Sequence, residues 1–206
     1  MAEPNAVAES AEQVVPGVWH WAVLNDRIGG AESSSHAVAG PEGTIFVDPV
    51  RLAEDALAGI ARVTAVCLTA KCHQRSAWRY RREAGAAVWA PEGTRPMEEE
   101  PDRRYRADDL LPGGLRAVHT PGPEEVHFSF LLEREPRVLF CSDLLTHYAG
   151  KELDFVPFEY HDDPAGTRRS VESLLELDFD VLCLAHGSPI ADDPKAAIRN
   201  LLARTA

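Results

Sequence analysis

The chain has 206 residues, 45% of them hydrophobic, which is enough for one domain with a full hydrophobic core. With 33 acidic and 21 basic residues, its formal net charge is −12. Such an acidic surface disfavours nucleic acids and anionic membranes as partners. The sequence also has no apolar stretch long enough to span a bilayer, so we expect no membrane partner.

The segment 1–14 is rich in Ala and Glu and lacks the basic start of a signal peptide. We therefore expect a flexible, frayed N-terminal tail, followed by a single domain over residues 15–206. Three of the cysteines, Cys67, Cys141 and Cys183, lie in apolar runs without paired spacing. Buried free thiols in a reducing compartment explain this pattern most simply, which favours a cytoplasmic protein. Whether the chains form a homo-oligomer stays open.

Apolar and alternating runs in the first half of the chain predict strands interrupted by two helices. The elements expected there are, in chain order, a strand over 17–23, a hairpin of strands 35–39 and 44–47, a helix over 52–63, a strand over 64–68, a helix over 77–84 with Gly85 as its C-cap, and a strand over 86–90.

The second half repeats this mixture of strands and helices, with two irregular segments over 94–112 and 146–163. Its expected elements are a strand over 115–119, a hairpin of strands 126–132 and 137–141, a helix over 165–177, a strand over 181–184 and a helix over 194–203. Bunched strands with inserted helices, in two similar halves, predict an α/β (α+β) fold in which two sheets pack together with helices outside, a four-layer αββα sandwich.

Polar residues follow four of the expected strands at the point where each strand ends. They are His73, the segment His119-Thr120-Pro121-Gly122, the pair Ser142-Asp143, and the pair His186-Gly187. Side chains that converge from several strand ends are how α/β scaffolds build functional sites. The sequence therefore places a candidate site at this edge of the sheets.

The order of these motifs resembles the metallo-β-lactamase superfamily from about Val14 to the C-terminus. The residues that carry the resemblance are Asp48-Pro49, His119-Thr120-Pro121-Gly122, Leu139-Phe140-Cys141-Ser142-Asp143 and Ala185-His186-Gly187. The resemblance implies an αββα sandwich. It also implies hydrolysis of an ester, thioester, lactam or phosphoester by metal-bound hydroxide.

The loop 69–76 departs from the family motif T-H-x-H-x-D-H, which supplies ligands to two metal ions. One register places Lys71, His73, Arg75 and Ser76 at the four ligand positions, and a second places Ala70, Cys72, Gln74 and Arg75 there. Pro123 replaces the last His of the family's H-T-P-G-H. In the first register, Lys71 and Arg75 would add two positive charges beside the metal ions and repel them. Arg75 could not lose its charge, because Arg does not deprotonate.

The ligands that survive in the first register are His73, Asp143 and His186. We therefore predict no metal or a single divalent metal, zinc being the first choice, and fewer than two bound ions. Cys72 could add a thiolate, but adjacent residues point apart on an extended strand. We also predict that Arg75 or Lys71 pairs with Asp143 in place of a metal.

The leading functional hypothesis is a metallo-β-lactamase-like hydrolase with an eroded, at most mononuclear site that acts on a small ester or thioester. One alternative is a non-catalytic protein that binds a small ligand or a partner through the same cleft. Another is metal-free acid–base chemistry by Lys71, His73 or Asp143, with Arg75 beside them. Purely structural roles for His73, as a hydrogen-bonded loop residue, and for His186, as a strand cap, also stay open. Four aromatic residues either line a substrate pocket or pack on the core: Tyr148, Phe155, Phe158 and Tyr160.

Overall fold

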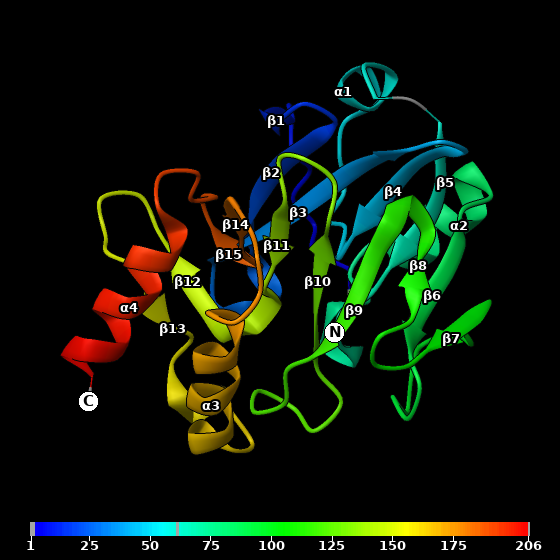
Figure 1. The fold of residues 1–206 in the computed structure, drawn as a ribbon. Helices are drawn as coiled ribbons and strands as arrows, with labels where there is room; N and C mark the ends of the chain where they lie inside the picture. Colours follow the sequence, from blue (N-terminus) through cyan, green and yellow to red (C-terminus); the bar gives the residue numbers. More distant parts are fainter. Residues whose placement is uncertain (1–2, 61, 206) are drawn as a thin grey trace.

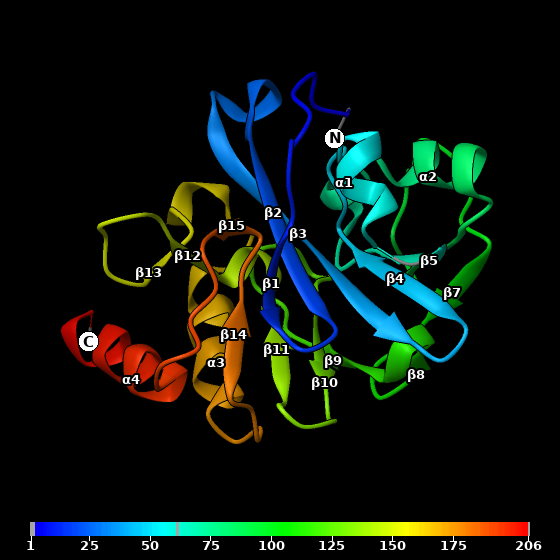
Figure 2. The same ribbon diagram turned by 90° about the horizontal axis from the view of Figure 1, so that it is seen from above.

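The computed structural model describes residues 3–60 and 62–205, and two large β-sheets dominate it (Figures 1 and 2). The first sheet has seven strands that follow one another in chain order. Strands β1 to β4 pair antiparallel, and strands β4 to β7 pair parallel. The strands are β1 (Glu12–Val15), β2 (Val18–Asn25), β3 (Ala31–Gly40), β4 (Gly43–Val47), β5 (Val63–Cys67), β6 (Ala87–Pro91) and β7 (Arg103–Tyr105).

The second sheet has five strands in the order β14-β11-β10-β9-β8, and a small three-stranded sheet has the order β13-β12-β15. In the larger of the two, β9, β10 and β11 form antiparallel pairs, while β14 joins β11 in parallel. The strands are β8 (Leu110–Leu111), β9 (Leu115–His119), β10 (Phe128–Leu132), β11 (Val138–Phe140), β12 (Leu145–His147), β13 (Asp154–Phe155), β14 (Val181–Cys183) and β15 (His186–Gly187).

The two large sheets lie between two pairs of helices, which makes four layers (Figure 2). Helices α1 (Glu54–Ala58) and α2 (Ala77–Ala84) flank the seven-stranded sheet, and α3 (Pro164–Leu174) and α4 (Pro194–Arg204) flank the other. Short 3-10 turns complete the chain: η1 (Asp26–Ile28), η2 (Lys71–His73), η3 (Pro112–Gly114), η4 (Ser142–Leu144) and η5 (Phe158–Tyr160).

Alternation along the strands explains why the layers form. In β4, the ring of Phe46 packs edge-on against Tyr80 of α2, while its neighbours Ile45 and Val47 belong to the core between the two sheets. Successive side chains of a strand point to opposite faces, so a strand buried on both faces is apolar at every position. In β10, likewise, Phe130 faces the other sheet and Leu131 packs in the cluster that contains α3 and α4. The predicted αββα sandwich is confirmed.

Most of the expected elements are present, and α2 has the predicted bounds, with Gly85 in the left-handed conformation as its C-cap. The helix expected over 52–63 is wrong in extent, because α1 covers only Glu54–Ala58. Leu52 instead forms an isolated bridge with Ala8, and Gly59 follows the last helical residue. The irregular segments expected over 94–112 and 146–163 contain the short strands β7, β8, β12 and β13.

The N-terminal segment packs on the domain, which corrects the expected frayed tail for residues 3–14. Ala8 is buried, its amide donates to the carbonyl of Arg51, and its carbonyl accepts from Ala53. Glu3 forms an ion pair with Arg79 at 2.7 Å, and β1 extends the first sheet. These backbone partners explain why a segment without an obvious apolar pattern is held in place.

All four cysteines are free, and Cys67, Cys141 and Cys183 are buried, as expected. Within the described residues, every helix is too short or too polar to cross a membrane.

Candidate functional site

Loops at the ends of strands from both sheets meet at one edge of the sandwich (Figure 1). Asp48 directly follows β4, Thr69 follows β5 by two positions, Asp143 lies in η4 after β11, and His186 begins β15. Because β4 and β5 run parallel, their C-terminal ends lie side by side. Hydrogen bonds from the amide (2.9 Å) and hydroxyl (2.5 Å) of Thr69 to the carboxylate of Asp48 join these two ends.

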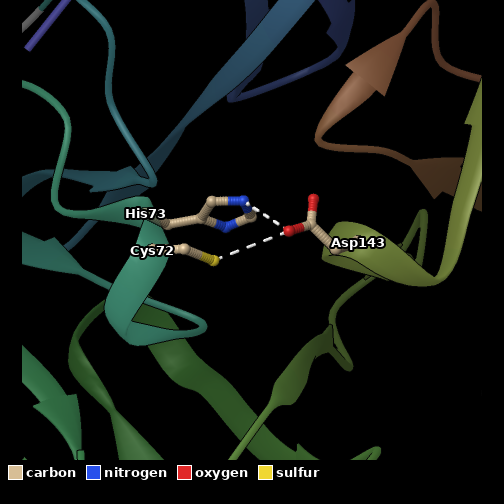
Figure 3. Close-up of side chains that lie close together, drawn as sticks. All are labelled: Cys72, His73 and Asp143. Atoms are coloured by element: carbon tan, nitrogen blue, oxygen red, sulfur yellow. Dashed lines mark hydrogen bonds and ion pairs between the residues drawn. The ribbon is translucent and has the colours of Figure 1, made fainter. Parts of the chain in front are cut away.

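Cys72 and His73 both reach Asp143, although they are adjacent in the chain (Figure 3). The Cys72 thiol donates to Asp143 Oδ2 over 3.6 Å, and His73 Nε2 lies 3.0 Å from the same oxygen. The expectation that these two side chains point apart is wrong, because they lie in the 3-10 turn η2 and not on a strand. Successive residues of such a turn are rotated by about 120°, against about 180° on a strand, so neighbours can share a face.

His73 is buried between two carboxylates. Its Nδ1 lies 2.9 Å from Asp48 Oδ2, and its Nε2 faces Asp143. Burial lowers the pKa of His73, but the charges of Asp143 and Asp48 outweigh it and raise that pKa to about 9. A carboxylate that accepts from one ring nitrogen is the usual surrounding of a histidine whose other nitrogen binds a metal. Either a proton on Nε2 or a metal ion satisfies both atoms of the His73–Asp143 contact.

His186 approaches the other oxygen of Asp143. Its Nδ1 donates to the carbonyl of Glu32 over 2.6 Å, so in the neutral ring Nε2 carries a lone pair. That Nε2 lies 3.0 Å from Asp143 Oδ1, a buried oxygen without a hydrogen-bond partner among the described residues. Two lone pairs at this distance repel each other unless a cation or proton lies beside them. The pair therefore needs a second proton on His186 or a metal cation between the two atoms.

His127 supports Asp143 from behind and is no ligand in this geometry. The amide of Asp143 donates to His127 Nε2 over 3.3 Å, and His127 Nδ1 donates to the carbonyl of Thr120 over 2.7 Å. Burial lowers the pKa of His127 to about 4, so the ring is neutral at pH 7 and can accept this bond. The result is a fixed backbone at Asp143.

The backbone around the site is strained. Asp48, Arg75 and Ser142 have φ angles of 47°, 37° and 54°, in the left-handed region that side chains other than glycine seldom adopt. Such conformations persist where surrounding contacts over-determine them, and they cluster at functional sites. Ser142 shows such contacts, since its hydroxyl lies 2.6 Å from that of Thr69 and 3.2 Å from His73 Nδ1.

The prediction that Arg75 or Lys71 pairs with Asp143 is wrong. Arg75 Nη1 donates to the carbonyls of Ser34 (2.7 Å) and Asp48 (3.0 Å). Lys71 is exposed, and its amine lies 4.0 Å from a carboxylate oxygen of Glu124. The physical reason is that the 3-10 turn η2 leaves Lys71 exposed and brings His73, not a cation, into contact with Asp143.

Few free donors lie at the positions where the family motif would hold a second metal ion. Ala70 and Pro123 have no donor atom in their side chains, and Gln74 is bound to the carbonyl of Lys71, the indole of Trp78 and the amide of Glu98. One ion does fit, because one donor atom each of Cys72, His73 and Asp143 lie within 4.8 Å of one another.

A cleft of about 610 Å³ opens onto this cluster. Tyr148 and Tyr160 line the cleft, whereas Phe155 is buried in the core cluster that contains residues of α3 and α4. Two of the four aromatic residues therefore form the expected lining. His161 also lines the cleft; its Nδ1 lies 2.9 Å from the hydroxyl of Thr167, and its buried Nε2 lacks a partner among the residues described. A second cavity of about 420 Å³ lies apart from the cluster, between His119 and α3.

Comparison with known proteins agrees with this fold and edge. Residues 56–186 match the family model described as the metallo-beta-lactamase superfamily. The chain belongs to the metallo-β-lactamase superfamily. Two solved structures illustrate the fold: a metallo-β-lactamase from Pontibacter korlensis (TM-score 0.72, 15% identity, 95% of this chain and 99% of that one) and a metallo-β-lactamase family protein from Thermus thermophilus (TM-score 0.68, 20% identity, 94% and 80%).

One curated relative has a stated activity. The chain is 28% identical over 116 residues to an atrochrysone carboxyl ACP thioesterase from Passalora fulva. The match covers 52% of this chain and 32% of the relative, so this superfamily member spans about a third of that protein's length. Superfamily membership and this distant thioesterase make the chain hydrolase-like at the level of the fold.

Sequence reasoning missed two contributions to the site. The sequence identified Asp48 only as part of the family resemblance, yet its carboxylate orients His73. The available signal was its position at the end of a buried strand. His161 had no signal at all, because the chain returns to the cleft through an irregular segment before α3.

Proposed function

We propose that this protein hydrolyses a small-molecule ester or thioester with one divalent metal ion, zinc being the first choice, held by His73, Asp143 and His186. Cys72 Sγ, which lies 3.6 Å from Asp143 Oδ2, would be a further donor. The observation that supports this most is the shared orientation of the two imidazoles: each Nδ1 has an acceptor behind it, and each Nε2 faces one oxygen of Asp143. Two histidines and a carboxylate form a known mononuclear set.

An ion at this place supplies Lewis acidity and lowers the pKa of water towards neutrality. The chain's own residues prepare the donors. Asp48 fixes the orientation of His73 and favours a neutral donor at Nε2, with the proton on Nδ1. His127 fixes the backbone of Asp143, and the carbonyl of Glu32 fixes His186.

The cleft supports a small molecule as the substrate. Its volume, about 610 Å³, lies in the range of ligand pockets, and Ile28, Val156, Pro157 and the two tyrosines give it apolar walls. The thioesterase relative favours an acyl thioester or ester among the superfamily's substrates. The net charge of −12 disfavours a strongly anionic macromolecule as the carrier of the acyl group.

Turnover of p-nitrophenyl esters and acyl thioesters by zinc-loaded protein tests the proposal. His73→Ala and Asp143→Asn should each lower kcat/KM by at least about a hundredfold, and a chelator should remove wild-type turnover. His119→Ala is the matched control, since this exposed histidine contacts the carbonyl of Glu125 outside the cleft. Turnover that survives both His73→Ala and the chelator would rule the proposal out.

A second candidate is a non-catalytic protein that binds a small ligand in the same cleft. The observation that favours it is the loss of donors at Ala70 and Pro123. In that case wild type and His73→Ala should be equally inactive on all substrates, and stabilisation of the fold by a ligand should persist in the variant.

A further inference from the structure

Arg75 is a buried cation without an anionic partner in the part of the chain described here. Arg75 is 4% exposed, and its Nη1 donates to the backbone carbonyls of Ser34 and Asp48. The nearby carboxylates of Asp48 and Asp143 are directed to His73. A buried charge normally has a partner of opposite charge, because burial of an unpaired charge is costly. The described residues give Arg75 no such partner.

The remaining donors of Arg75 are available to the cleft. A guanidinium presents its N–H groups as a planar fork, and the contacts of Nη1 leave those of Nη2 and Nε without a protein acceptor among residues 3–60 and 62–205. Arg75 also lines the cleft of about 610 Å³, beside His73 and Asp143. The two carbonyl contacts hold the side chain at this place, and the backbone of Arg75, with φ of 37°, lies in the left-handed region.

We propose that Arg75 forms a carboxylate-binding subsite in the cleft, so that the ligands of this protein are organic acids or their derivatives with a free carboxylate. A carboxylate matches the fork of a guanidinium with two parallel hydrogen bonds. The apolar residues Ile28, Val156 and Pro157 would contact the organic part of the ligand. The binding subsite is argued from Arg75 alone. The inference rests on the proposed function only in that the bound acid is taken to be a substrate.

Charge in the cleft is consistent with an anion. Among the residues that line the cleft, the two arginines Arg27 and Arg75 balance the two carboxylates of Asp143 and Glu124. Glu124 also lies 4.0 Å from the exposed Lys71. An incoming carboxylate would therefore meet a cleft without net negative charge.

The test uses metal-free, chelator-treated protein and isothermal titration with benzoate, benzamide and phenylphosphonate, which share one ring. Wild type should bind benzoate at least about tenfold more tightly than benzamide, and more tightly than phenylphosphonate. Arg75→Met should lose the preference for benzoate over benzamide. Arg27→Met, at a second arginine of the same cleft that donates to the carbonyl of Glu3, should keep it.

Equal affinities for benzoate and benzamide in wild type, or a preference that survives Arg75→Met, would overturn the proposal. Tighter binding of phenylphosphonate would overturn its assignment to carboxylates. If Arg75→Met does not fold, a crystal structure of wild type with benzoate decides: the carboxylate must contact Nη2 or Nε of Arg75. None of these readouts needs turnover or a metal. They therefore test the carboxylate subsite separately from the hydrolase proposal, and either one can fail without the other.

Discussion

Asp48→Asn is the substitution that best separates a metal-binding His73 from a merely hydrogen-bonded one. Asp48 Oδ2 accepts from the hydroxyl of Thr69 and lies 2.9 Å from His73 Nδ1, while Oδ1 accepts the amide of Thr69. An asparagine with its oxygen on the Thr69 amide would turn its NH₂ group to His73. The imidazole would then accept at Nδ1 and carry its proton on Nε2, the atom that should bind the metal.

The magnitude follows from the behaviour of such outer carboxylates. Their loss lowers metal affinity by about 10- to 100-fold, which corresponds to about 1.4 to 2.7 kcal/mol. We expect the upper end for Asp48→Asn, because the change removes a charge and also disfavours the required tautomer. Competition between the protein and a chromophoric chelator for zinc measures the affinity directly.

Asp193→Asn is the matched control. Asp193 caps α4 by accepting from the amide of Ala196, and asparagine caps helices about as well as aspartate. The control should keep both zinc affinity and stability. A folded Asp48→Asn protein that binds zinc as tightly as wild type would refute the role given to His73.

Three further outcomes are expected. Cobalt-loaded wild type should show a thiolate-to-metal absorption band that Cys72→Ser abolishes; an unchanged spectrum would remove Cys72 from the donors. Lys71→Gln should leave zinc affinity and turnover unchanged, because this side chain is exposed, and a loss above about tenfold would restore Lys71 to the site. Gly187→Ala should destabilise the fold by about 2 kcal/mol or more in urea unfolding, since φ is 99° and a Cβ there would collide with the backbone of His147. Gly150→Ala, with φ of 70° and open space around it, should cost less; equal losses would contradict the steric argument.

The fold was predictable because its signals are local. Period-2 and continuous apolar runs located the central strands of both sheets but missed the short strands β1, β7 and β8, and Gly85 marked the end of α2 as a left-handed cap. The helix expected over 52–63 failed because an apolar period of 3.6 in a short segment does not show whether residues such as Leu52 pair with a distant chain. Leu52 forms its bridge with Ala8, and only the folded structure shows that contact.

The sequence predicted which residues form the site but not which of them contact one another. His73, Asp143 and His186 were identified as strand-end residues, and the structure brings them together. The register of the loop 69–76 could not be settled, because a 3-10 turn and a strand present different sets of neighbours from the same sequence. Charge alone suggested that Arg75 or Lys71 pairs with Asp143; instead Arg75 donates to two backbone carbonyls, and Lys71 is exposed near Glu124.

The stoichiometry of bound metal tests the central claim most directly. Protein saturated with zinc, dialysed and analysed by plasma mass spectrometry should retain one ion per chain, and His73→Ala should retain markedly less under the same dialysis. Two ions per chain would show that residues outside the surviving set complete a dinuclear site. Retention of no zinc by folded wild type would contradict the metal centre itself.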